Sequence, residues 1–471
     1  MAQSHQATYT QGSIFKHLVT LSGTSAVGLF AIFIVDLVDV FFISILGAPE
    51  LAAAVGFAGI GLFLGASVCI GISIGISTLV AQAIGASNEE DARRLATHGL
   101  IYTLLWTVPV TVATLVYAPQ LMALVGASGE TLDLAVGYFR IVGCSLPVLG
   151  FAMAGTSLLR SVGDPKQSMW ATIVGGLVNA VLDPIFIFAL SMGLTGAAIA
   201  SVISRISVAG VAMYAVLKKH QLLVPVQPSK FLADTRALTG IALPSLVTNL
   251  SAPVSSAYAT AQMARFGTDA VAAASVIGRL TPVAFAGLYG LSGSVGPIAS
   301  QNFGAGLYHR IEETLIASLK FCFAYVLPVG LLLLLLKGWL IQVFDLQGEA
   351  ADLLSFYTTF IVFSYALFGL QLAANPVMNA LRHPGFSTIS NISRDLLLAV
   401  PLVGLFAGWF GARGVLAGQA VANAIAGLVA FAVALWLIRR VERGQSIDLP
   451  LARLSLHHHR AVAPGVQHRG H

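Results

Sequence analysis

Long apolar segments separated by short polar breaks run along nearly the whole chain. A helix needs about 20 apolar residues to cross a bilayer, and segments of this kind recur through the sequence. They are expected at about residues 14–46, 51–83, 96–125, 132–159, 167–190, 194–217, 240–265, 270–300, 314–345, 353–380, 386–410 and 414–438. The pattern predicts an all-α polytopic membrane protein with twelve transmembrane helices.

One clearly polar stretch, from Lys218 to Arg236, interrupts this pattern and divides the predicted spans six and six. Its prolines and charged residues are typical of an interdomain linker. We therefore expect an N-terminal lobe over residues 1–217, a cytoplasmic linker over 218–239 and a C-terminal lobe over 240–440. The polar remainder, residues 441–471, is expected to be a disordered cytoplasmic tail, and we interpret its His457–His459 run as part of that tail.

Composition supports a membrane protein and excludes several other classes. Of the 471 residues, 57% are hydrophobic and 10% are charged, against about 25% charged in soluble domains. The net charge of +5 comes without a basic stripe interleaved with aromatics, so no nucleic-acid partner is expected. Cys69, Cys144 and Cys322 lie far apart in apolar segments, which predicts neither disulfides nor a metal site. The first apolar run is too long for a cleavable signal peptide.

Lysine and arginine gather in alternate loops, which predicts the orientation in the membrane. The loops on one side carry Arg93, Arg94, Arg160, Lys166, Lys218, Lys219, Lys230, Arg236, Arg310, Arg382, Arg439, Arg440 and Arg443. The opposite loops carry little beyond Arg265, Lys337 and Arg413. Because basic loops stay in the cytoplasm, both termini and the linker are expected there.

The two halves of the chain resemble each other at an offset near 219. Residues 47–54 recur at 267–274, and the run from Gln82 to Ala86 recurs as Gln301 to Ala305. Six spans separate each pair, so equivalent spans cross the membrane in the same direction. The halves are then parallel repeats related by a pseudo-two-fold axis along the membrane normal. Two lobes that face a central cavity are a transporter architecture.

A polar cluster stands inside the fifth predicted span. Asn179 and Asp183 are four residues apart and share one helix face. Pro184 has no N–H, so the carbonyl of Ala180 loses its usual helix partner. A carboxylate at this depth costs several kcal/mol unless it is paired, protonated or in contact with water. Its oxygen ligands suit a proton or a small cation.

The repeat places uncharged residues at the matching positions of the second lobe: Asn179 matches Leu396, Asp183 matches Val400 and Asp39 of the first span matches Tyr258. A purely structural hydrogen-bond network has no obvious reason to be lost from one lobe only. We therefore expect the first lobe to handle a coupling ion and the second to support substrate binding or rocking.

The chain resembles the MATE (multidrug and toxic compound extrusion) family of cation-coupled exporters, in its bacterial DinF-type branch. The matching stretches span most of the chain: Val38–Asp39 to Leu46–Gly47 with residues 51–54, Leu159 to Lys166, Asn179 to Phe188 with Gly193 and residues 196–201, and Gln301 to Gly306. The resemblance implies two six-helix lobes, a V-shaped cavity and antiport of organic compounds against H⁺ or Na⁺.

The family's ion-coupling residues correspond to specific positions in this chain. Its first-helix acid corresponds to Asp39, its fifth-helix Asn and Asp to Asn179 and Asp183, and its sixth-helix hydroxyl to Ser201. The NorM-type branch has a Glu in its seventh span, and no Glu stands between Leu243 and Arg265 here. Asp36 is a further departure, because the family more often has a neutral polar residue there.

Asp39 and Asp183 are the strongest candidates for a shared site. Two close carboxylates cannot both ionise cheaply, so one is expected to hold a proton, or the pair a Na⁺ ion. Asn179 and Ser201 would complete the site, and Asp36, three residues before Asp39, is a second carrier or a gate. The structural alternative is a set of interhelical polar contacts, each worth about 1 kcal/mol in membranes.

Candidates for substrate binding lie in the second lobe. Asp395 follows Arg394, and neighbours on a helix point about 100° apart, so the two need not pair. Asp395 is expected either to attract a cationic substrate or to pair with Lys320 or Arg279. A polar, adaptable face of the seventh span suits varied ligands, although ordinary packing explains it as well. That face consists of Asn249, Tyr258, Gln262 and Met263.

These features together predict a secondary antiporter rather than an enzyme. It is expected to export organic, often cationic and amphipathic compounds in exchange for H⁺ or Na⁺ as its lobes rock. No ATP-binding motif and no cofactor are expected, and the protein is expected to be a monomer in a bacterial inner membrane. The alternative within transporters is a lipid-linked saccharide flippase, disfavoured because the charge within the first-lobe spans is acidic. A membrane-embedded lipid transferase and a channel are further alternatives.

Overall fold

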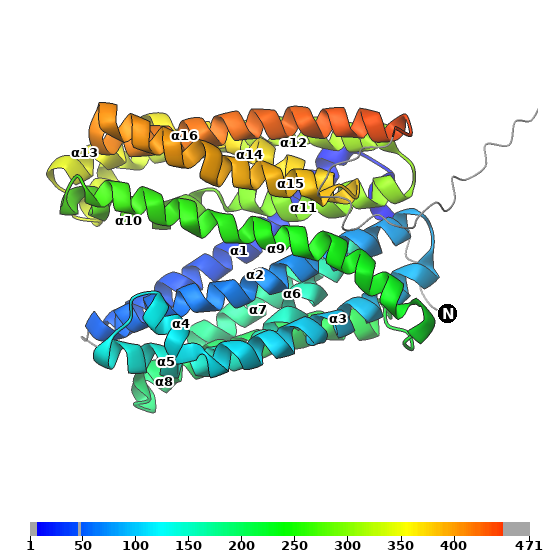
Figure 1. Cartoon of the computed structure of the whole chain (residues 1–471), viewed down its shortest axis with the longest axis horizontal. Coiled ribbons are helices and arrows are strands. Elements are labelled where there is room, and N and C mark those ends of the chain that lie inside the picture. The colour runs from blue at the N-terminus through cyan, green and yellow to red at the C-terminus, as the bar shows by residue number, and fades with distance from the viewer. Residues whose placement is uncertain (1–6, 46–48, 446–471) are drawn as a thin grey trace, which may run out of the picture.

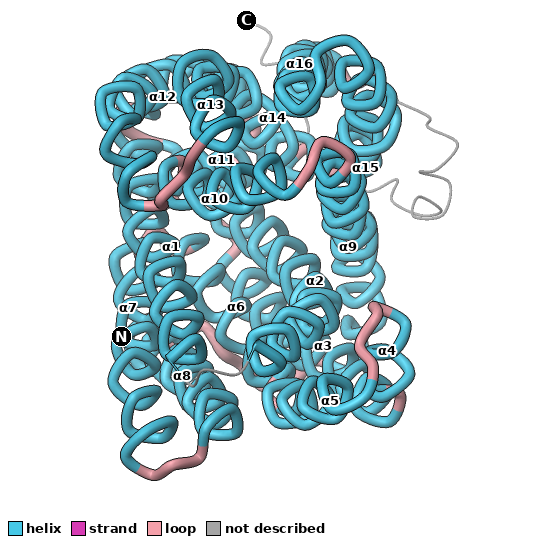
Figure 2. Tube along the Cα trace, turned by 90° about the vertical axis from the view of Figure 1, so that its left-hand side faces the viewer, coloured by secondary structure: helices cyan, strands magenta, loops and turns pink. Residues whose placement is uncertain are grey.

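The computed structural model describes residues 7–445 except 46–48, and every regular element among them is a helix (Figure 1). Within α1 the side chains at 36, 37, 39–41 and 43–45 are outside the described part of the structure. The chain forms two lobes, which lie one above the other in Figure 1 and are seen from the end in Figure 2. The expected all-α, two-lobed architecture is confirmed.

The helices of the first half are short 3₁₀ and π turns joined to long α-helices. In order they are η1 (Thr8–Thr10), α1 (Ile14–Ile45), α2 (Pro49–Gly85), α3 (Glu89–Val116), α4 (Ala118–Leu124), α5 (Gly129–Cys144), α6 (Leu146–Ser161), α7 (Pro165–Pro184), η2 (Ile185–Ala189), α8 (Gly193–Tyr214) and η3 (Ala215–Lys219).

The second half follows the same plan. Its helices are α9 (Pro228–Ala264), α10 (Thr268–Ala284), α11 (Ala286–Gly304), α12 (Tyr308–Val343), α13 (Gly348–Phe356), η4 (Tyr357–Ile361), α14 (Val362–Ala380), α15 (Pro384–Ile392), η5 (Ser393–Leu398) and α16 (Ala399–Glu442). Helix α9 begins at Pro228, within the stretch expected to form the linker.

The spans can be counted once three breaks are recognised. Within the described residues, nine helices are long and apolar enough to cross a membrane, or eleven when the bent pairs α5–α6 and α10–α11 each count as one span. The 59-residue stretch Pro384–Glu442 turns back on itself at Gly411, whose φ of 62° is left-handed. Beyond the turn, Gly414 lies against the carbonyl of Phe406. Dividing this stretch at Gly411 adds one span to the eleven and gives the expected twelve.

The lobes join through two helices that occupy equivalent places in the repeat. Helix α9 packs on α2 of the first lobe, and α1 packs on α11 of the second. Glycines make both contacts close: a Cβ at Gly71 would lie 2.7 Å from the carbonyl oxygen of Ala242, and one at Gly290 would lie 2.9 Å from that of Ser22. Gly71 and Gly290 are repeat partners 219 positions apart. The pseudo-two-fold relation therefore extends to individual backbone contacts.

At one end of the bundle, α2 and α11 cross each other with their backbones touching. A Cβ on Gly85 would lie 1.9 Å from the carbonyl oxygen of Gln301, and a Cβ on Gly304 would lie 2.0 Å from that of Gln82. These residues belong to the repeated Gln82–Ala86 and Gln301–Ala305 runs. We call this crossing the closed end, because both lobes meet there without room for a side chain at either glycine.

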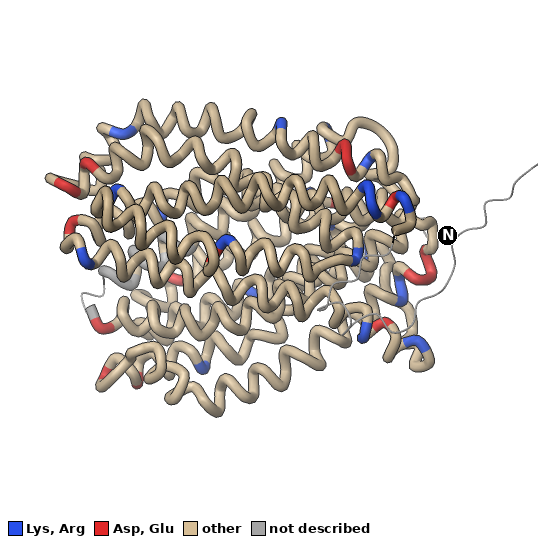
Figure 3. Tube along the Cα trace, turned by 45° about the horizontal axis from the view of Figure 1, so that its top comes forward, with Lys and Arg blue, Asp and Glu red and all other residues tan. Residues whose placement is uncertain are grey.

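Charged residues gather at the two ends of the bundle and are sparse along its middle (Figure 3). One of them, Asp164, caps α7 by accepting a bond from the backbone N–H of Gln167, as the amide of Asn88 caps α3. Asp164 also accepts bonds from His220 at 3.0 Å and Lys219 at 2.6 Å. The hydrogen bond from His220 is the main reason that the pKa of the Asp164 carboxyl lies well below its usual range.

Candidate functional site

Small residues bring three helices of the first lobe together around α7. Gly28 of α1 lies beside Thr172, and Gly176 of α7 lies beside Val35 of α1. On the other side, the Ser204 hydroxyl of α8 donates to the carbonyl of Gly175 at 2.8 Å. Small residues allow this close approach, which replaces the hydrophobic effect as the main source of packing energy in lipid.

Asn179 and Asp183 lie on α7 beyond these contacts and form a hydrogen-bonded pair. The Asn179 Nδ2 donates to Asp183 Oδ2 at 2.6 Å. Asp183 is fully buried and Asn179 is 4% exposed. Helix α7 ends at Pro184, where the chain continues as the π-helical turn η2. The two residues share one helix face, as the sequence predicts, and they bond to each other inside a helix that qualifies as a membrane span.

The remaining first-lobe candidates lie on α8 and α1. Ser201 is half-buried on α8, between two contacts: Ser204 touches Gly175 of α7, and Gly196 touches Phe186 of η2. Asn179 and Asp183 lie between Gly175 and Phe186 in the chain. Asp36 and Asp39 belong to α1, and their side chains lie outside the described part of the structure.

Four of the second-lobe substrate candidates have ordinary structural surroundings. Met263 is 2% exposed in the apolar core, and the Tyr258 hydroxyl approaches Gly404 of α16. Asn249 donates to the carbonyl of Ser245 on its own helix, and Gln262 accepts a bond from Arg265. None of the four lines the second-lobe cavity that is described below.

Asp395 pairs with Arg394, its neighbour in the chain, instead of Lys320 or Arg279. The distance from Arg394 Nη2 to Asp395 Oδ1 is 2.7 Å, and the Ser251 hydroxyl donates to Asp395 Oδ2 at 2.6 Å. The sequence reasoning was wrong to set this neighbour aside. It assumed a regular helix, whereas the pair lies in the π-helical turn η5, and the long arginine side chain curls back to the carboxylate. The ion pair removes the net negative charge that would attract a cation.

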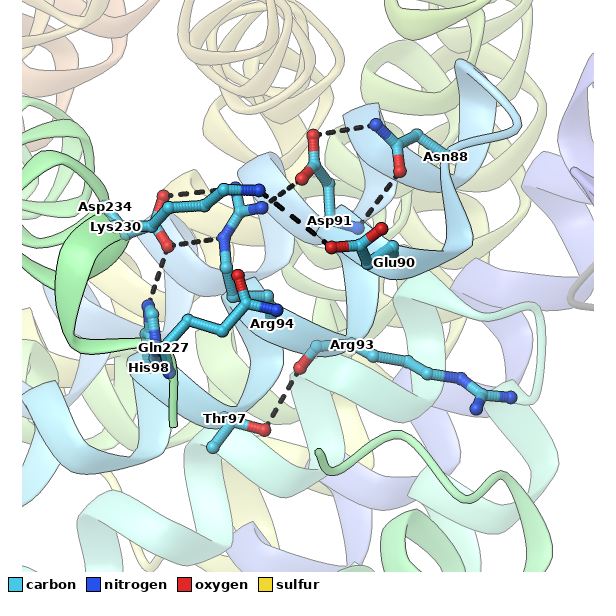
Figure 4. A network of polar contacts seen from close by, with 10 residues as sticks. All are labelled: Asn88, Glu90, Asp91, Arg93, Arg94, Thr97, His98, Gln227, Lys230 and Asp234. Atoms are coloured by element: carbon cyan, nitrogen blue, oxygen red, sulfur yellow. Dashed lines mark hydrogen bonds and ion pairs between the residues drawn. The ribbon is translucent and has the colours of Figure 1, made fainter. Parts of the chain in front are cut away.

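A further polar network, missed by the sequence reasoning, joins α3 to the start of α9 (Figure 4). Asp234 accepts bonds from Arg94 Nε at 2.9 Å and from His98 Nδ1 at 2.7 Å. The backbone N–H of Gln227 donates to His98 Nε2 at 3.2 Å. Arg94 also contacts Asp91 of its own helix. The network fixes the start of α9 on the first lobe.

Hydrogen bonds also connect the lobes at the closed end. Gln82 Nε2 donates to the carbonyl of Ala380, and its Oε1 accepts from Arg382. In the repeat-related position, Gln301 Nε2 donates to the carbonyl of Ser161, and its Oε1 accepts from the backbone N–H of Tyr9. Each glutamine thus reaches from its own lobe to the other. The repeat in the sequence signalled these residues but not their role.

The sequence matches the MatE family model twice, over residues 25–185 and 244–405. The chain belongs to the MATE family. The second match begins at residue 244, 219 positions after the first begins at residue 25, as the internal repeat predicts.

Relatives of this MATE protein are transporters. It is 28% identical to the FAD transporter of Shewanella oneidensis over 89% of this chain and 94% of the relative. It is 25% identical to the probable multidrug resistance protein YoeA of Bacillus subtilis, over 71% and 74%. The multidrug export protein MepA of Staphylococcus haemolyticus is 23% identical, over 92% and 96%. The expectation of a secondary multidrug transporter is therefore confirmed, and a lipid-linked saccharide flippase is not favoured.

Solved structures have the same fold as this MATE protein. A crystal structure of MATE in complex with MaD3S superposes with a TM-score of 0.87 at 24% identity, covering 94% of this chain and 100% of that one. An outward-facing conformation of a multidrug resistance MATE family transporter gives 0.87 at 24%, covering 94% and 99%.

Proposed function

We propose that this MATE protein is a cation-coupled antiporter that uses the Asn179–Asp183 pair to exchange H⁺ or Na⁺ for organic compounds. The observation that carries the proposal is the full burial of the Asp183 carboxyl within a membrane-spanning helix, hydrogen-bonded to an amide. A charged carboxylate is costly at such a place. It is therefore most stable when it binds a proton or a small cation, and loss of that ion changes the balance of the helices around it.

The packing of α1 against α7 supports Asp39 as the second carboxylate. Helices α1 and α7 run in parallel, because Gly28 meets Thr172 and Val35 meets Gly176. If both helices continue by one turn beyond Val35 and Gly176, positions 39 and 180 are expected to come to a similar level. Position 180 lies between Asn179 and Asp183 in the chain. We propose that Ser201 contributes from α8 and that Asp36 is a secondary carrier or gate.

We propose that the closed end faces the cytoplasm of a bacterial cell, with the protein in the inner membrane. Arg94, Arg160, Arg310 and Arg382 lie at or beside the network and crossing found at this end. Basic residues favour the cytoplasmic side, so both termini would lie there. Residues 218–239 would then connect the lobes on that side, and the protein would act as a monomer.

The proposed substrates are small organic compounds, amphipathic and often cationic, as for the drug exporters among the relatives. The Shewanella oneidensis relative is named for FAD, which is an anionic dinucleotide with a flat ring system. We therefore include flavins in the range to be tested. We assign no catalytic reaction and no cofactor to this chain.

Uptake of a fluorescent dye into inside-out vesicles tests the coupling, with ΔpH and Na⁺ gradients imposed separately. We expect one gradient to drive uptake, and Asp183→Asn and Asp39→Asn to reduce the driven rate at least about tenfold, a coupling energy in the usual range. Asp133→Asn, which alters an exposed carboxylate on α5, is the matched control and should transport normally. Driven uptake at the control rate in Asp183→Asn would remove the pair from the coupling site.

A further inference from the structure

The second lobe contains a cavity of about 270 Å³ between α9, α10, α11, η4, α14, η5 and α16. Close-packed protein interiors leave few voids larger than a water molecule. Drug-sized ligands occupy pockets of about 300–1,000 Å³. A cavity of this size therefore fits one ring system of a ligand, with the rest of the ligand outside it.

One wall of the cavity is a cluster of aromatic side chains in fixed contact. Tyr365 stacks on Phe285 with ring centroids 4.4 Å apart and meets Phe368 edge to face at 5.9 Å. Tyr289 meets Phe368 at 6.3 Å. Tyr289, Tyr365 and Phe368 line the cavity. Rings held by one another in this way offer a rigid apolar surface to a flat ligand at little entropic cost.

The ion pair of Arg394 and Asp395 lies beside this aromatic wall in the lining of the cavity. The Arg394 guanidinium lies 5.1 Å from the centroid of the Phe368 ring, and its Nη1 donates to Gln371 Oε1 at 3.3 Å. Both oxygens of Asp395 are engaged, Oδ1 by Arg394 and Oδ2 by Ser251. A guanidinium has five N–H donors, and these contacts use at most three. Two donors therefore remain for acceptor atoms of a ligand.

Neutral polar groups complete the lining, and no second acid joins them. Gln419 and Asn423 of α16 offer amide donors and acceptors. With one arginine and one aspartate the lining has no net charge, so it does not select for a cation as an acidic site would. A cavity with this polar lining is expected to hold water or a ligand, because empty protein cavities are apolar.

The repeat shows that these features are present in the second lobe and not at the matched positions of the first. Tyr289 and Tyr365 match Ile70 and Leu146 of the first lobe at the offset of 219. At offsets of 217–219, Arg394 and Asp395 match positions 175–178, which hold glycine, leucine and valine. The first lobe has the buried Asn179–Asp183 pair, whose matched positions in the second lobe hold Leu396 and Val400. The second lobe has an aromatic and ion-paired cavity whose key residues have no counterpart at the matched positions of the first. Such reciprocal specialisation fits one site for the ion and another for the exported compound.

We infer that the second-lobe cavity binds the flat heteroaromatic ring of a neutral or anionic exported compound. The ring stacks on Tyr365 and Tyr289, and its carbonyl or phosphate oxygens accept the remaining N–H bonds of Arg394. Asn423 and Gln419 pair with the polar edge of the ring. This inference rests on the proposed function, because it supplies that transporter with a substrate site separate from the ion site.

Binding to the purified full-length protein in detergent tests the site without any ion gradient. The probes are riboflavin, which is neutral, FMN, which has the same ring with a phosphate, and ethidium, a cationic aromatic. Tyrosine stacking quenches flavin fluorescence, so titration gives a dissociation constant. We expect riboflavin and FMN to bind at least about tenfold more tightly than ethidium. Tyr365→Leu should weaken flavin binding roughly tenfold, as loss of one stacking partner does elsewhere.

Two further variants separate recognition from folding. Arg394→Lys keeps the charge beside Asp395 but loses the planar fork, and it should weaken FMN binding roughly tenfold. Asn423→Leu changes the polar edge without touching the ion pair and should weaken riboflavin binding. Tyr214→Leu and Arg413→Gln alter an exposed tyrosine and an exposed arginine away from the cavity, and they should bind as wild type does. Melting curves identify any variant that fails to fold.

The possible outcomes distinguish this inference from the proposed function. Flavin binding that none of the three cavity variants weakens, tighter binding of ethidium than of flavins, or no binding of any probe overturns the inference. If flavins bind and cavity variants weaken that binding while no gradient drives uptake in vesicles, the site stands and the antiport proposal fails. If gradients drive uptake but the cavity variants bind normally, antiport stands and this site fails.

Discussion

The crossing of α2 and α11 at the closed end depends on two glycines, and alanine at either position should force the lobes apart. An added Cβ at Gly85 would lie 1.9 Å from the carbonyl oxygen of Gln301, although real Cβ contacts essentially never fall below 3.0 Å. The backbones therefore have to separate by about 1 Å, the difference between these two distances. In the repeat-related variant Gly304→Ala, the added Cβ would lie 2.0 Å from the carbonyl oxygen of Gln82.

The magnitude follows from the cost of overpacking a close-packed contact, which is about 1–3 kcal/mol. This overpacking energy destabilises only the state in which the lobes touch at the closed end. The state in which the lobes are separated there is unaffected. The ratio of closed to open molecules should therefore fall by about 5- to 150-fold. Transport should slow as well, because alternating access needs both states to be populated.

Cysteine labelling measures this ratio directly. Ala380 is fully buried, and its carbonyl accepts the bond from Gln82 across the closed end. An Ala380→Cys reporter in a Cys144→Ser background, which removes the exposed native cysteine, should react slowly with a membrane-impermeant maleimide applied from this side. Adding Gly85→Ala or Gly304→Ala should accelerate labelling by about 5- to 150-fold.

Alanine at glycines with open space provides the matched controls. A Cβ at Gly210 of the first lobe or at Gly278 of the second would meet no atom within 4 Å. Gly210→Ala and Gly278→Ala should label and transport as the parent does. Equal labelling rates in the Gly85→Ala, Gly304→Ala and control proteins would refute the argument that backbone contact between the lobes closes this end.

Two other predictions concern the polar contacts that hold helix starts in place. Asp234→Asn should lower the free energy of unfolding by about 3 kcal/mol, because Arg94 stays buried with Asp91 as its remaining carboxylate partner. Melting curves of this variant and of the exposed-site control Asp133→Asn measure the loss. Equal melting temperatures of the two variants would contradict the prediction. Asp164 has a lowered pKa in the folded protein, so its stabilisation is present above a pH of about 4 and is lost as the pH falls below it. The wild type should therefore lose more melting temperature between pH 6 and pH 3 than Asp164→Asn does, and parallel curves would argue against the contacts with His220 and Lys219.

Hydrophobic patterning determined the fold because a membrane imposes a single simple rule. Each span must be apolar for about 20 residues and must satisfy its own backbone, so its position can be read from the chain without tertiary information. The repeat added the relation between the lobes, since its offset is preserved in the sequence. The sequence also separated the spans 386–410 and 414–438, and the structure places the reversal between them at Gly411. The Asn179–Asp183 pair was equally accessible, because an i, i+4 contact depends on the helix alone.

Contacts between distant segments could not be predicted in this way. The repeated glutamine and glycine runs showed that two places are equivalent, but not that their backbones cross and seal one end. Asp395 was interpreted from regular helix geometry, and the π-helical turn gave it a partner that this geometry disfavoured. The aromatic residues of the second-lobe cavity come from separate helices and look like ordinary core residues in the sequence. The sequence alone determined what lies along each helix, because helical periodicity is local. Only the tertiary structure decided what lies between helices, because side chains far apart in the chain meet there through packing.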